Sequence, residues 1–132
     1  MENLVTNIPE LLILLFIVIT FLQSGMDKIT DWGGNIGWLK GHFEKTFMGG
    51  MVPLMVGIIL VMEILAGLLA VWGIVSIITT SDRSIALYAS VLAAITLLML
   101  LFGQRVAKDY AGAFTITGYF MVVVFGIYLL TH

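Results

Sequence analysis

Long apolar runs dominate the chain and are separated by short polar segments. Four of these runs stand out, at about residues 8–28, 53–78, 85–104 and 113–131. Each has close to the ~20 residues that a helix rising ~1.5 Å per residue needs to cross ~30 Å of hydrocarbon. Because lipid offers the backbone no hydrogen-bond partners, an open chain satisfies its peptide groups there only as helices. The pattern therefore predicts an all-α integral membrane protein with four spans in one bundle.

The connections between the runs differ in length. A short turn around Asp82 and Arg83, with serines on either side, makes the second and third spans antiparallel neighbours. The first connection, residues 29–52, is the longest, and apolar residues recur on one helical face within it. They are Ile36, Leu39, Phe43 and Phe47. We expect a short interfacial helix here, with its aromatic rings at headgroup depth.

Composition supports the membrane interpretation and excludes other classes. Of the 132 residues, 61% are hydrophobic and only 11% are charged, which is too little polar surface to coat a water-soluble globule. No linker-like segment divides the chain, so residues 1–132 form a single domain. The first run has no basic flank or cleavage site, and we interpret it as a permanent span. A net charge of −2 with scattered basic residues argues against nucleic acid binding. There is no Cys, hence no disulfide or thiolate site.

Basic residues predict the orientation. Four spans place both termini on one side, and the first and third connections on the other. The connections hold five basic residues, namely Lys28, Lys40, Lys45, Arg105 and Lys108, whereas the terminal side has Arg83 and the amino terminus. The positive-inside rule then puts the two connections in the cytoplasm and the termini outside.

Glu63 is the first candidate for chemistry. It lies about ten residues into the second run, or roughly 15 Å by helix rise. A carboxyl group inside a span is costly and usually faces the bundle interior, where it finds a partner or stays protonated. Two interpretations stay open: a carboxyl that pins two helices together, or a group that binds a ligand or handles protons.

Other polar residues gather in the half of the bundle that Glu63 approaches, whereas the terminal half carries few. The candidates for ligand binding or proton handling, beside Glu63, are Lys28, Gln23, Gln104, Arg105 and Tyr119. A polar cluster in one half of a bundle is typical of a pocket mouth. Gln23 and Asp27 share a helical face. Lys28 can also be explained as a lysine that snorkels to lipid phosphate, and Arg105 as the partner of Asp109 in a helical ion pair that caps the third span.

No metal site or catalytic motif is expected. His42 and His132 are too few and too far apart to bind a metal with the available carboxylates. No Ser-His-Asp order and no phosphate-binding glycine motif occurs, and Gly33-Gly34 is better explained as a loop hinge. The sequence names no catalytic nucleophile and predicts no covalently bound cofactor.

The whole chain resembles the DoxX-like family of small four-helix membrane proteins. The resemblance rests on Phe21-Leu22-Gln23-Ser24-Gly25-Met26-Asp27-Lys28, on Glu63-Ile64-Leu65-Ala66-Gly67 in a Pro-led second span, and on the segment Gly103–Gly112. It implies a protein of the bacterial inner membrane, in a family with members linked to thiosulfate:quinone oxidoreduction or to oxidative-stress complexes. Family relatives that work through paired cysteines are a poor guide to a chain without cysteine.

Three functions follow from the sequence. The first is an accessory subunit, without catalysis of its own, that docks onto a larger membrane assembly handling quinone or electrons. The second is an enzyme-like quinone site, in which Glu63 exchanges a proton while Lys28, Gln23 or Arg105 binds a ring oxygen. The third is a small carrier or lipid-binding protein that uses the same pocket. The expected partners are the lipid bilayer and other membrane subunits.

Overall fold

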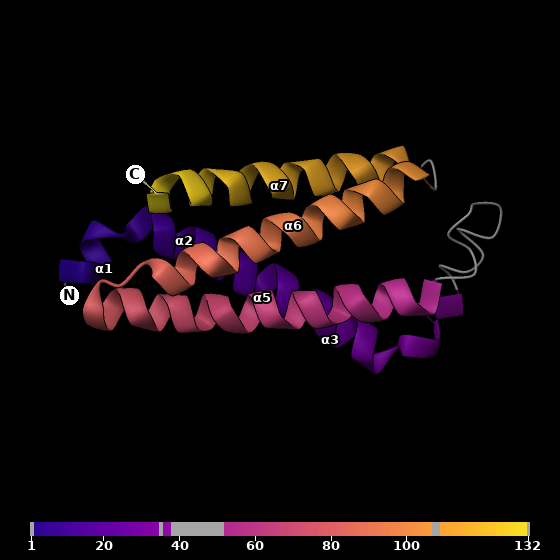
Figure 1. The fold of residues 1–132 in the computed structure, drawn as a ribbon, viewed down its shortest axis with the longest axis horizontal. Coiled ribbons are helices and arrows are strands. Elements are labelled where there is room, and N and C mark those ends of the chain that lie inside the picture. Colours follow the sequence, from indigo (N-terminus) through magenta and orange to yellow (C-terminus); the bar gives the residue numbers. More distant parts are fainter. Residues whose placement is uncertain (1, 35, 38–51, 107–108, 132) are drawn as a thin grey trace.

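The computed structural model describes residues 2–34, 36–37, 52–106 and 109–131, and these are helical almost throughout (Figure 1). The helices, in chain order, are α1 (Glu2–Thr6), α2 (Ile8–Ile17), the π-helical segment η1 (Val18–Leu22), α3 (Gln23–Thr30), α5 (Val52–Thr80), α6 (Ser84–Val106) and α7 (Tyr110–Thr131). The described residues contain no strand. The predicted all-α fold is confirmed.

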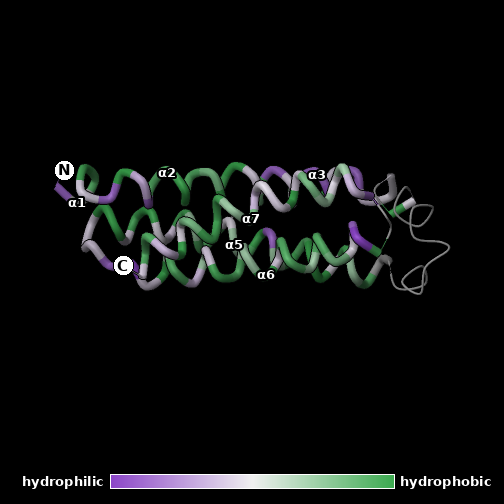
Figure 2. The backbone as a smooth tube through the Cα atoms, turned by 90° about the horizontal axis from the view of Figure 1, so that it is seen from above, coloured by the Kyte–Doolittle hydropathy of each residue, from purple (hydrophilic) through white to green (hydrophobic). Residues whose placement is uncertain are grey.

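Four helices are long and apolar enough to cross a membrane. They are Ile8–Thr30, which joins α2, η1 and α3, then Leu54–Thr80, Ser84–Val106 and Tyr110–Thr131. Apolar residues cover most of the length of these spans (Figure 2), and many large ones, such as Leu68 and Phe125, are exposed on the outside of the bundle. Because water would make such a surface unfavourable, the exposed faces are the ones that lipid covers. The protein is a multi-pass membrane protein.

The first span begins and the fourth ends as predicted, at Ile8 and Thr131, and the other ends extend one to three residues beyond the predicted runs. Polar residues such as Thr80 and Arg105 continue these helices past their apolar parts. The short helix α1 was not predicted. Residues 32–34 and 36–37 are also helical. The rest of the predicted interfacial helix, including Leu39, Phe43 and Phe47, lies outside the described residues.

Small residues bring α5 and α6 together. Ala66 and Ala70 of α5 and Ala86 and Ala93 of α6 are fully buried. A Cβ atom added to Gly73 would lie 2.8 Å from the Cα atom of Ala86, so the two backbones approach as closely as glycine permits. Such contacts are a main source of helix association in lipid. The very short turn at residues 81–83 makes these helices antiparallel neighbours, as predicted.

The two ends of the bundle differ in packing. Both termini lie at one end, called here the terminal side, and the first and third connections leave from the other, called the connection side (Figure 1). Near the terminal side α2 packs against both α5 and α7. Toward the connection side, α3 packs on α5, while α7 packs on α6. The first and fourth spans therefore separate toward the connection side.

Candidate functional site

A buried ion pair joins the first and second spans. Lys28 Nζ of α3 lies 2.8 Å from Glu63 Oε1 of α5, and the Glu63 side chain is only 4% exposed. The same ammonium group donates a hydrogen bond to Ser24 Oγ, at 2.7 Å, one turn earlier in α3. Two of the predicted site residues are thus in direct contact. The interpretation of Lys28 as a lysine that snorkels to lipid phosphate is wrong, because its ammonium group faces a partner inside the bundle.

The lengths of the helices explain how a residue near the end of one span meets a residue well inside another. After α3 the chain continues alongside the start of α5, where the ring of Trp32 lies 3.9 Å from the position of a Cβ atom on Gly57. The end of α3 therefore lies level with Glu63 rather than with the first residue of α5. Counted back from Thr80, where α5 ends, Glu63 lies about 26 Å along the helix. This is close to the ~30 Å thickness of the hydrocarbon, so Glu63 is nearer the connection side than a count from Pro53 suggests.

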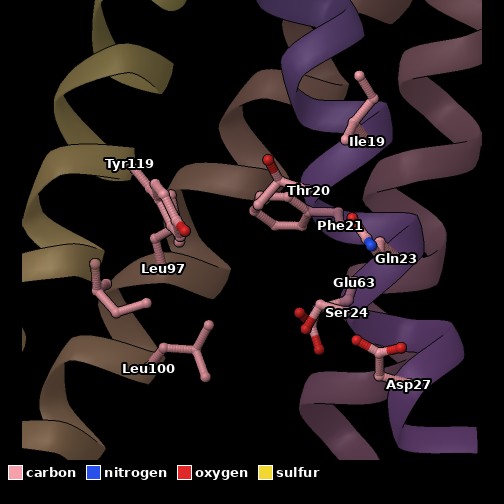
Figure 3. Close-up of a pocket in the computed structure, with 11 residues that line it drawn as sticks. Ile19, Thr20, Phe21, Gln23, Ser24, Asp27, Glu63, Leu97, Leu100 and Tyr119 are labelled. Carbon is pink, nitrogen blue, oxygen red and sulfur yellow. The ribbon is translucent and has the colours of Figure 1, made fainter. Parts of the chain in front are cut away.

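A cavity of about 320 Å³ opens beside Glu63. Its wall is formed by all four spans, and the side chains of Glu63 and Ser24 point across it toward Leu97, Leu100 and Tyr119 (Figure 3). The lining residues are Ile19, Thr20, Phe21, Gln23, Ser24, Asp27, Glu63, Leu97, Leu100, Ile116 and Tyr119. We call this space the Glu63 cavity. It occupies the region in which α3 and α7 have separated.

Several polar groups in the cavity wall have no partner among the residues that the structure describes. Among the described residues, nothing forms a hydrogen bond or an ion pair with the side chains of Thr20, Gln23 or Asp27, and the Tyr119 hydroxyl group also has no such partner. The contact of Glu63 with Lys28 is made through Oε1, and Oε2 has no partner in the described part of the chain. Unsatisfied polar groups are costly where water is scarce. These groups are therefore available to water or to a ligand.

A π-helical segment shapes one side of this wall. The residues of η1 include Ile19, Thr20 and Phe21, which line the cavity. The wider π turn changes the direction of the side chains along the span, and such segments occur frequently at functional sites. Thr20 thereby joins the polar wall, whereas the sequence placed it in the half of the bundle with few polar groups. Nothing in the sequence Val18–Leu22 signalled the π turn.

Of the predicted site residues, Gln23, Glu63 and Tyr119 line the cavity and Lys28 lies behind Glu63. Tyr119 is held by an edge-to-face contact with Phe16, with ring centroids 5.8 Å apart. Gln23 and Asp27 both line the cavity, which confirms that they share a face. Ser24 and Asp27, which the sequence placed at the depth of Glu63 as possible partners of its carboxyl group, and Thr20, which it did not, complete the polar wall.

Gln104 and Arg105 are not lining residues of the cavity. They lie at the turn from α6 to α7, where the Gln104 carbonyl group accepts a hydrogen bond from the backbone N–H of Asp109, at 2.8 Å. The Arg105 guanidinium group lies over the ring of Tyr110, 5.1 Å from its centroid. The predicted helical spacing of Arg105 and Asp109 is wrong, because α6 ends at Val106. Asp109 instead accepts a hydrogen bond from the backbone N–H of Gly112 and caps the start of α7.

A second ion pair, which the sequence analysis did not predict, links the helices at the terminal side. Arg83, in the turn before α6, pairs with the buried Glu10 of α2 and donates a hydrogen bond to the carbonyl oxygen of Leu129 in α7, at 2.7 Å. One side chain thus joins three spans. A signal was present, since Glu10 is an acid within the first apolar run and Arg83 is the basic residue of the same side. Glu10 precedes Lys28 by about 27 Å of helix, which is close to the ~30 Å thickness of the hydrocarbon, so the two ion pairs lie toward opposite ends of the bundle.

No group of three or more metal-ligating side chains occurs among the described residues. No family model, no curated protein and no solved structure matches this chain. The resemblance to the DoxX-like family therefore stays a prediction from the sequence.

Proposed function

We propose that this protein binds a small amphipathic molecule in the Glu63 cavity, with the polar head among the unpartnered side chains and the tail among the apolar ones. The observation that carries the proposal is the set of polar groups that face one intramembrane space and have no partner in the described part of the chain. A packing role alone needs only the Lys28–Glu63 ion pair. It does not need Thr20, Gln23, Asp27 and Tyr119 around the same space.

The size and depth of the cavity fit such a ligand. Its volume of about 320 Å³ is at the lower end of the ~300–1,000 Å³ that is typical of ligand sites. Leu100 precedes Arg105 by about 7.5 Å of helix, which places the cavity a little inside the connection-side edge of the hydrocarbon. A molecule that arrives through the lipid reaches this depth with its head toward the polar edge.

The test is ligand retention. We expect native mass spectrometry of the purified protein to detect a bound small molecule or lipid, and we expect Leu100→Trp, which fills the cavity, to remove it. Leu98→Trp is the matched control, because Leu98 lies on the same helix and is 49% exposed on the lipid-facing side. Equal retention by the two variants would show that the ligand does not occupy the Glu63 cavity.

Two further proposals come from the sequence. In the first, the bound molecule is a quinone and Glu63 exchanges a proton with it, so that Glu63→Gln would abolish quinone-dependent turnover without loss of the fold. In the second, the chain is an accessory subunit of a larger assembly of the bacterial inner membrane, related to the DoxX-like proteins. The spread of basic residues supports termini outside and connections in the cytoplasm. A cysteine introduced in place of Glu2 should then react with a membrane-impermeant reagent added to intact spheroplasts.

A further inference from the structure

The charges around the Glu63 cavity are unequal. Two of its lining residues, Asp27 and Glu63, are acids, and among the described residues none that lines it is basic. Lys28 lies behind the wall and is already engaged by Glu63 Oε1 and Ser24 Oγ. One carboxylate of the wall is therefore balanced by a lysine, and the other has no cationic partner among the described residues.

We propose that the cavity selects amphipathic molecules with a protonated amine head over neutral or anionic molecules with the same tail. This inference rests on the proposed function and specifies the class of ligand. An ammonium group supplies three hydrogen-bond donors and one positive charge. The wall offers matching acceptors, namely the free carboxylate of Asp27, Oε2 of Glu63 and the hydroxyl oxygen of Thr20. Hydrogen bonds in which a partner is ionised are the stronger class.

The burial of Glu63 further favours a cationic ligand over an anionic one. The residue is 97% buried, and its carboxylate points into the cavity between α3 and α6 (Figure 3). Charges interact strongly where the surroundings exclude water, so an incoming carboxylate or phosphate head would be repelled by the buried carboxylate of Glu63, and Asp27 at the exposed edge of the cavity adds to this repulsion. An unpaired like charge of this kind is an effective way to reject a ligand. A neutral head would leave the charge of Asp27 without a partner.

The tail has a separate surface. Leu97 and Leu100 of α6 form the apolar side of the cavity, opposite the acids (Figure 3), and Ile116 of α7 also lines the cavity. A ligand bound with its head between Asp27 and Glu63 would lay its tail against these residues. The inference therefore predicts a single-chain amine rather than a small polar cation without a tail.

The inference can be tested with four probes that have alkyl tails of similar length and differ in the head group. We would measure binding of dodecylamine, dodecanol, dodecanoate and a decyl-substituted benzoquinone by isothermal titration calorimetry, with the protein in zwitterionic nanodiscs. The Leu100→Trp protein in identical nanodiscs serves as the reference, so that partition of each probe into the lipid cancels. Ile116→Trp is a second reference in case Leu100→Trp fails to fold.

We expect dodecylamine to bind about tenfold or more tightly than the other three probes, since a tenfold difference corresponds to one good charge-assisted contact. Asp27→Asn should remove most of this preference. Asp27 is exposed and makes no ion pair with the described residues, so its replacement leaves the fold intact. Glu2→Gln, which removes an exposed acid at the terminal side, should change nothing.

Two results would overturn the inference, and they differ in what they say of the proposed function. If dodecanol, dodecanoate or the quinone binds as tightly as dodecylamine, and cavity filling still abolishes binding, the selection is refuted and the cavity remains a binding site. If no probe binds more tightly to the unmodified protein than to the filled variants, both the selection and the proposed function fail.

Discussion

The ion pair between Lys28 and Glu63 provides the sharpest test of the structure. Nζ and Oε1 are 2.8 Å apart, and the two side chains are 17% and 4% exposed. At an effective dielectric constant of about 20, two charges at this distance attract each other by about 6 kcal/mol. The desolvation of both groups opposes this attraction and cancels much of it. The pair as a whole therefore contributes little to stability, while the removal of one partner is costly.

These magnitudes predict a characteristic double-mutant cycle. Lys28→Met leaves a buried carboxylate without a cation, and Glu63→Gln leaves an ammonium group held by Ser24 alone. Each should lower the free energy of unfolding by about 3–5 kcal/mol, the usual range for breaking a buried pair. The double variant should lose no more than either single variant, which gives a coupling energy of about 3 kcal/mol or more.

The measurement is reversible unfolding in mixed micelles, followed by the loss of helical circular dichroism as the denaturing detergent is increased. A pair with the same charges at the other end of the bundle, Arg83 and Glu10, provides a comparison. Glu10→Gln combined with Lys28→Met should be additive, because the two sites lie about 27 Å apart along the span. If Lys28→Met and Glu63→Gln are also additive, the two charges do not interact in the folded protein and the proposed site is wrong.

Three further predictions concern packing, pH and partners. Gly73→Ala should destabilise the bundle by about 1–3 kcal/mol, since its Cβ atom would meet the backbone of Ala86, whereas Gly118→Ala, with nothing within 4 Å, should stabilise it slightly in thermal denaturation. The backbone N–H and the hydroxyl group of Ser84 lower the pKa of Asp82 below its usual 3.8. That carboxylate therefore stabilises the fold above the usual pKa and stops doing so as the pH falls through the lowered one, so Asp82→Asn should flatten the acid side of a plot of melting temperature against pH. Purification of the native protein in mild detergent should recover the same membrane proteins reproducibly if it is an accessory subunit; a protein that always purifies alone would contradict that hypothesis.

Much of the fold could be predicted because the bilayer limits the solutions. Once a run such as Ile85–Gln104 is apolar and long enough, helix is the conformation that satisfies its backbone in lipid, whatever its neighbours are. The short turn around Asp82 then makes α5 and α6 neighbours without further information. The predicted ends of the helices were less accurate, because Thr80 and Arg105 continue their helices beyond the apolar part.

The site was predicted in part. Glu63 stood out because an acid inside an apolar run is costly, and Gln23 and Tyr119 were found because they lie in the same half of the bundle. The position of Gln104 in the sequence gives its depth in the bilayer but not the direction of its side chain. Gln104 was therefore wrongly expected beside the cavity. Glu10 was overlooked because its partner, Arg83, is distant in the sequence and its role appears only when α2 and the turn before α6 are brought together.

By itself the sequence determined the class of protein, the number of spans and the residues for which burial would be costly, since these follow from local apolar length and from the chemistry of single side chains. Only the tertiary structure decided which costly residues meet. The end of α3 lies level with Glu63 of α5, which brings Lys28 to Glu63. The π turn of η1 adds Thr20 to the cavity wall, and the separation of α3 from α7 leaves the space of the cavity. These features depend on how four helices shift and rotate against one another, which is settled by the packing of small residues across their contacts.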